Sequence, residues 1–116
     1  MSQTEIDRNL LKDLDKLEPL IGNTPMYQFS RLHDNPEVKL YAKLEWQQLG
    51  GSVKARPAFN IIKQAILSGK LTREKTLIDA SSGNTAIAYA AIAASLGIKV
   101  RLFIPENEIG YAECRL

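Results

Sequence analysis

The sequence predicts an α/β domain, because strand-like and helix-like patterns alternate from residue 38 to residue 104. Strands are expected at residues 38–46, 76–80 and 99–104, and helices at residues 58–68 and 85–96. An alternation of strand and helix is typical of a parallel sheet whose crossover connections are helical. The length of 116 residues is sufficient for one such domain with its own core.

The first predicted strand has an apolar residue at every second position. A period of two indicates a strand with one buried face. The apolar members are Val38, Leu40, Ala42, Leu44 and Trp46. In the predicted helix at residues 85–96, apolar side chains lie almost all round, which indicates that more than one side is buried.

A further helix is expected at about residues 5–17, where apolar residues recur on one face. Those residues are Ile6, Leu10, Leu14 and Leu17. Thr4 is a suitable N-cap for this helix, with Asp7 at the capping-box position. We therefore divide the chain into a helical segment at residues 1–18 and a larger unit at residues 19–116.

The composition is that of an ordinary soluble globular protein, with 45% hydrophobic and 24% charged residues. A net charge of +2 gives no reason to expect nucleic acid or a membrane surface as a partner. The longest apolar run, residues 86–96, is too short to span a membrane, and the charged N-terminus does not resemble a signal peptide. Cys114 is the only cysteine, which excludes an intramolecular disulfide and fits a reducing compartment. We expect a cytoplasmic protein without a metal site.

The turn at residues 50–54 (Gly-Gly-Ser-Val-Lys) leads into the predicted helix at residues 58–68. Pro57 suits the first helical position, where its missing N–H would have no partner, so Lys54 is expected at the mouth of the helix. Such a lysine can bind phosphate as a cation or form a Schiff base as a neutral amine, and its alternative is a solvated surface charge. The spacing does not match a P-loop, because the two glycines are adjacent and Ala55 follows the lysine.

A second polar turn, at residues 81–85 (Ser-Ser-Gly-Asn-Thr), connects a predicted strand to a predicted helix. Free backbone N–H groups and the helix dipole at a helix N-terminus favour an anion such as a carboxylate. The alternative is a purely structural turn in which Ser82 or Asn84 caps the helix. Both turns follow the carboxyl ends of strands, where open parallel sheets bind ligands. The sequence therefore predicts a site for a small anionic molecule.

Three motifs resemble those of the cysteine synthase (O-acetylserine sulfhydrylase) and cystathionine β-synthase family. Residues 50–54, followed by Arg56 and Pro57, resemble the pyridoxal-phosphate lysine motif of that family. Residues 21–25 (Ile-Gly-Asn-Thr-Pro) are similar to its opening signature, and residues 82–85 to its asparagine loop. The motifs stand in the family's order. The resemblance implies the N-terminal portion of a tryptophan synthase β-like fold, a partial three-layer arrangement of mostly parallel strands with flanking helices.

The resemblance also implies roles for individual residues. Lys54 would hold pyridoxal 5'-phosphate through a Schiff base and then act as base and acid at the substrate α-carbon. Asn84 would hydrogen-bond the ring hydroxyl of the cofactor. Three residues, Ser81, Ser82 and Thr85, would hold the carboxylate of the amino-acid substrate. The implied reaction is a β-replacement, in which an O-activated serine loses its leaving group and sulfide adds to give cysteine.

Length is the main departure from the family pattern, because the chain has less than half of the family's usual extent. No residues match the family's glycine-rich phosphate loop or its serine partner of the pyridine nitrogen. A second hypothesis is therefore a non-catalytic truncated remnant that acts as an oligomerisation or binding module. We expect the helix at residues 85–96 to lack an intrachain partner on one side, and hence a homodimer or higher homo-oligomer.

Overall fold

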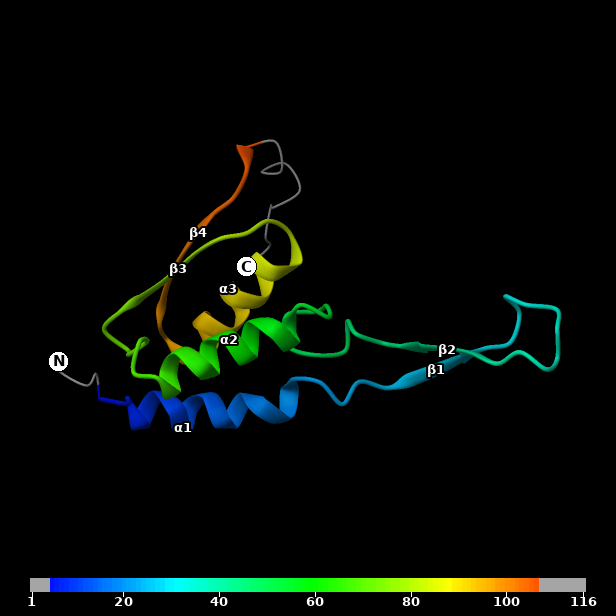
Figure 1. Cartoon of the computed structure of the whole chain (residues 1–116), viewed down its shortest axis with the longest axis horizontal. Coiled ribbons are helices and arrows are strands. Elements are labelled where there is room, and N and C mark those ends of the chain that lie inside the picture. Colours follow the sequence, from blue (N-terminus) through cyan, green and yellow to red (C-terminus); the bar gives the residue numbers. More distant parts are fainter. Residues whose placement is uncertain (1–4, 107–116) are drawn as a thin grey trace.

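The computed structural model of the chain describes residues 5–106 and shows helices beside two small sheets (Figure 1). The elements are α1 (Arg8–Leu17), a 3-10 turn (Glu18–Leu20), β1 (Met26–Phe29), β2 (Leu40–Lys43), α2 (Ala55–Leu67), β3 (Thr76–Ala80), α3 (Asn84–Leu96) and β4 (Lys99–Phe103). β1 and β2 pair antiparallel, whereas β3 and β4 pair parallel. The predicted α/β class is confirmed. No helix within the described part of the chain is long and apolar enough to cross a membrane.

The core lies between the three helices and one face of the β3–β4 sheet. α1, α2 and α3 contact one another, and α3 also contacts β4. The largest fully buried side chains are Leu10, Leu14, Ile62, Ile66 and Ile92. Burying each such side chain stabilises the fold by roughly 1.5–3 kcal/mol relative to its exposed state. These contacts fix α2 and α3 as neighbours, and both helices begin at the same end of the helical layer (Figure 1).

Helix α1 begins later than predicted, and its cap differs from the prediction. Asp7 is the N-cap, and its carboxylate accepts a hydrogen bond of 3.0 Å from the backbone N–H of Leu10. The backbone N–H of Arg73 donates to the same carboxylate at 3.0 Å. The bond from Leu10, followed by that from Arg73, lowers the pKa of Asp7. The predicted capping box was wrong, because Asp7 takes the N-cap position itself. Thr4 lies outside the described residues.

Helix α2 begins three residues before the predicted start. Lys54 is its N-cap, which confirms the prediction that this lysine lies at the mouth of the helix. Pro57 occupies the third helical position and not the first. The helix tolerates it there because the first four N–H groups of a helix have no intrahelical acceptor.

The predicted strand at residues 38–46 with one buried face was wrong. Only Leu40–Lys43 is a strand, and it pairs with β1 in an arm that projects from the helices (Figure 1). Trp46 is 62% exposed, and both faces of the arm are open. The expectation that this strand joins the parallel sheet was wrong too. Alternation identifies the residues that share a face, but it does not show what covers that face.

Helix α3 has partners inside the chain on one side, but its side with Ile87, 37% exposed, and the exposed Ala94 is open, so the expectation of an uncovered side is confirmed. It packs against α1, α2 and β4 with Ala88, Tyr89 and Ile92 buried. Apolar side chains are also open on the outer face of the parallel sheet, where Ile78 is 57% and Phe103 58% exposed beside Lys99 and Arg101. Parallel sheets are normally covered on both faces, and this sheet is covered by helices on one.

Candidate functional site

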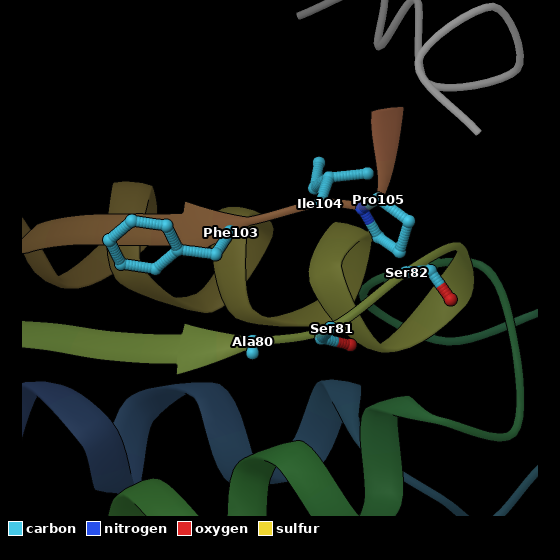
Figure 2. Close-up of a pocket in the computed structure, with 6 residues that line it drawn as sticks. All are labelled: Ala80, Ser81, Ser82, Phe103, Ile104 and Pro105. Carbon is cyan, nitrogen blue, oxygen red and sulfur yellow. The ribbon is translucent and has the colours of Figure 1, made fainter. Parts of the chain in front are cut away.

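A pocket of about 360 Å³ opens at the carboxyl ends of β3 and β4 (Figure 2). It is lined by Ala80, Ser81, Ser82, Phe103, Ile104 and Pro105. The parallel register sets Ala80 beside Phe103, and the backbone N–H of Ser81 donates to the Phe103 carbonyl at 3.1 Å. The strand pairing therefore continues into the polar turn and holds Ser81 at the pocket, with Ser82 next to it in sequence. Figure 2 shows both on the segment that joins β3 to α3.

The polar turn leaves the N-terminus of α3 without a side-chain cap. Gly83 is the N-cap, with φ +63°, and the first bond of the helix joins the N–H of Ile87 to the Gly83 carbonyl at 3.2 Å. The alternative in which Ser82 or Asn84 caps the helix was therefore wrong. N–H groups in the first turn of a helix have no intrahelical acceptor and favour an anion.

Lys54 lies at the start of the helix beside α3. The backbone N–H of Lys54 donates to the Ser52 hydroxyl at 3.2 Å, while its amine has no polar partner among residues 5–106. The turn before it packs closely on α3, since a Cβ on Gly50 would lie 3.3 Å from the Cα of Ala88. Ala88 is one helical turn beyond Asn84. The lysine turn is thus placed against the first half of α3.

The structure brings together some of the predicted site residues and leaves others apart. Ser81 and Ser82 line one pocket, whereas Asn84 and Thr85 form the first turn of α3 and are not part of its lining. Lys54 is exposed and is also outside the lining. Among residues 5–106, no cluster of histidine, cysteine and carboxylate side chains could hold a metal ion.

Sequence reasoning missed a polar cluster beside the lysine turn, centred on the carboxylate of Glu45. Arg56 donates to both its oxygens, from Nε at 2.8 Å and from Nη2 at 3.0 Å. The Thr24 hydroxyl donates at 2.5 Å and Gln48 Nε2 at 2.9 Å. We call these four residues the Glu45 cluster. In the sequence, two members of the cluster lie in or beside the motifs and the other two come just before the lysine turn. Their spacing alone does not predict that these polar side chains contact one another in the fold.

The cluster keeps the Glu45 carboxylate charged. Its hydrogen bonds, led by that from Arg56, lower the pKa of Glu45 from its ordinary value near 4.5 to about 2. In turn, Glu45 raises the pKa of Arg56. Because the folded-state pKa of Glu45 is depressed, its contribution to stability is present above pH 4.5 and is lost as the pH falls toward 2.

Residues 17–112 match the family described as pyridoxal-phosphate dependent enzyme. The chain belongs to this family. The cysteine synthase of Aquifex aeolicus is 42% identical to it over 106 residues, which cover 89% of this chain and 32% of that protein. This pyridoxal-phosphate family member thus spans about a third of the length of that relative.

Two solved structures resemble this one. A hydrogen sulfide-producing enzyme from Fusobacterium nucleatum matches with a TM-score of 0.70 and 34% identity, over 81% of this chain and 30% of that one. The O-acetylserine dependent cystathionine beta-synthase from Helicobacter pylori matches with a TM-score of 0.67 and 36% identity, over 79% of this chain and 31% of that one. The resemblance to cysteine synthases and cystathionine β-synthases that the three motifs indicate is confirmed.

The residues of the site fit the chemical groups of pyridoxal phosphate and an amino acid. An exposed amine, two pocket hydroxyls and an uncapped helix N-terminus are carried by neighbouring elements. An amine can react with an aldehyde, and an uncapped helix N-terminus with adjacent hydroxyls can bind a carboxylate or phosphate. The arrangement can therefore accept an anionic aldehyde or an amino acid.

Proposed function

We propose that the chain carries the lysine and carboxylate-binding part of a cysteine synthase-like enzyme that uses pyridoxal 5'-phosphate. The proposed reaction is a β-replacement on an O-activated serine with sulfide to give cysteine. The observation that supports it best is the position of Lys54, at the start of a helix packed beside the uncapped N-terminus of α3. The match of residues 17–112 to the pyridoxal-phosphate dependent enzyme family supports Lys54 as the amine that binds this cofactor.

The site residues have three roles in this proposal. Lys54 holds the cofactor and moves the proton at the substrate α-carbon. Ser81, Ser82 and Thr85 hold the substrate carboxylate together with the free N–H groups of α3, and the Asn84 amide holds the ring hydroxyl of the cofactor. When bound, pyridoxal phosphate supplies an aldehyde for amines and a ring that draws electrons from the α-carbon. The protein residues orient the reactants and transfer the proton.

The proposal is tested by titrating the purified chain with pyridoxal phosphate and recording visible absorption. We expect a protein-bound visible band that borohydride discharges, and cysteine formation after O-acetylserine and sulfide are added. A chain that stays colourless with excess cofactor would contradict the proposal and favour the non-catalytic binding or oligomerisation module. A coloured chain that forms no cysteine would limit the function to cofactor binding.

Replacing Asn84 with alanine should weaken ligand binding without destabilising α3. The loss of one hydrogen-bond partner at the cofactor is expected to cost about 1–3 kcal/mol of binding free energy. Stability should change little, because Gly83 is the N-cap and Asn84 does not cap the helix. Binding titrations and thermal melts on the same variant separate the two effects. A fall in stability of about 1 kcal/mol with unchanged binding would instead indicate a capping role.

The open side of α3 and the exposed apolar residues on the outer face of the adjoining parallel sheet lead us to propose a homodimer or higher homo-oligomer. Ile78 and Phe103 lie on this face, away from the helices, and their burial between copies would remove apolar surface from water. Sedimentation over a wide concentration range should show association, and Ile78→Asp should weaken it. A folded monomer at every concentration would contradict the proposed assembly.

A further inference from the structure

Short-range hydrogen bonds hold the lysine turn in part, among them those from the N–H of Gly51 to the Gln48 carbonyl at 2.9 Å and from the N–H of Lys54 to the Ser52 hydroxyl at 3.2 Å. Gly50 and Gly51 have φ values of +96° and +71°, a region that residues with side chains rarely adopt. Such glycines lose more conformational freedom on folding than other residues do. Contacts on the two sides of the turn would therefore add to the local hydrogen bonds in fixing the position of Lys54.

The Glu45 cluster supplies these contacts on both sides. Before the glycines, Gln48 Nε2 donates to the Glu45 carboxylate at 2.9 Å and to the Ser52 carbonyl at 3.0 Å. After the lysine, Arg56 in the first turn of α2 forms a bidentate ion pair with the same carboxylate. One carboxylate thus connects the residues that precede the turn with those that follow it.

The cluster also anchors the turn to the opening signature at residues 21–25. The backbone N–H of Gly22 donates to Gln48 Oε1 at 2.8 Å, and the Thr24 hydroxyl donates to Glu45. Gly22 itself leaves room for the guanidinium, because a Cβ there would lie 2.9 Å from Nη1 of Arg56. Thr24 is buried and the Glu45 side chain is only 21% exposed, so these bonds are partly shielded from water.

We propose that the Glu45 cluster is a set of positioning residues that holds the lysine turn and presents the Lys54 amine to its aldehyde partner. The inference rests on the proposed function, because it takes Lys54 as the amine that binds the cofactor. It assigns a role to the opening signature, which contributes Gly22 and Thr24 and is distant in sequence from the lysine. The cluster touches neither substrate nor cofactor in this proposal and acts through the backbone of the turn.

The test measures pyridoxal phosphate attachment at each lysine separately. The chain is incubated with pyridoxal phosphate, quenched with borohydride at timed intervals, digested and analysed by quantitative mass spectrometry. In Glu45→Gln, which keeps the side-chain size and removes the charge, attachment at Lys54 should slow about tenfold to a hundredfold relative to the summed other lysines. Thr24→Val should slow it as well, and Thr24→Ser, which retains the hydroxyl, should restore the wild-type rate.

Glu18→Gln is the matched control. Glu18 lies outside the cluster, and its carboxylate forms an ion pair of 3.3 Å with Lys63, which is on α2 like Arg56. This variant should leave the rate of pyridoxal phosphate attachment at Lys54 unchanged. Thermal melts identify any variant that does not fold. If Glu45→Gln does not fold, the comparison of Lys54 attachment between Thr24→Val and Thr24→Ser decides the result. A folded Glu45→Gln or Thr24→Val chain with the wild-type Lys54 rate would overturn the inference while leaving the proposed function intact. Wild-type attachment without preference for Lys54 would overturn both.

Discussion

Replacing Lys54 with alanine should abolish the visible band formed with pyridoxal phosphate while leaving the fold intact. The side chain is exposed and its amine forms no hydrogen bond or salt bridge with residues 5–106, so its removal should change the unfolding free energy by less than about 0.5 kcal/mol. The loss of cofactor attachment should nevertheless be complete, because Lys54 is the amine that the proposed function assigns to the cofactor. Absorption after cofactor titration and urea unfolding on the same preparation measure the two quantities.

Lys70→Ala is the control for this prediction. Lys70 is also exposed and lies just beyond the other end of α2, so its removal takes away one amine without changing the site. The band should persist in Lys70→Ala with wild-type intensity. A Lys54→Ala chain that keeps the band would assign the cofactor to a different amine.

The second large effect is expected in the core, where Leu14 of α1 is fully buried among the helices. Leu14→Ala removes buried methyl groups and leaves a cavity, which should cost about 2–5 kcal/mol of unfolding free energy. The cost should be visible as a lower midpoint in urea, monitored by circular dichroism. It arises because α1 packs against both α2 and α3.

Leu67→Ala provides the matched comparison, since Leu67 is a helical leucine on α2 that is 38% exposed. Its cost should be well below that of Leu14→Ala. Equal, small costs for the two variants would show that α1 is not part of the cooperative unit. That result would support the division at residue 18, in which residues 1–18 form a segment apart from the rest.

Local patterns were sufficient to predict the helices and the parallel pair of strands. The strand at Thr76–Ala80 and the end of α3 at Leu96 agree with the prediction, because they depend on runs of apolar residues ended by polar or glycine residues. The placement of Lys54 at a helix start also follows from its neighbours in sequence. Each of these features is decided within a few residues.

Features that depend on distant residues could not be predicted in the same way. The alternation in residues 38–46 is real, but the arm it forms has no layer on either side, so no face is buried. The cap of α3 falls on Gly83 because the backbone turns there with positive φ, although Ser82 and Asn84 are better cap formers by type. The Glu45 cluster joins residues separated by up to 32 positions, and no local pattern encodes that contact.

The central claim, that Lys54 is the cofactor-binding amine, is tested most directly by locating the reduced pyridoxal phosphate adduct in the wild-type chain. The sequence contains nine lysines, so nonspecific attachment would be spread over many peptides. Borohydride reduction at a low ratio of cofactor to protein, followed by peptide mapping, should place the adduct on Lys54. An adduct concentrated on another lysine, or distributed among the nine, would contradict the claim.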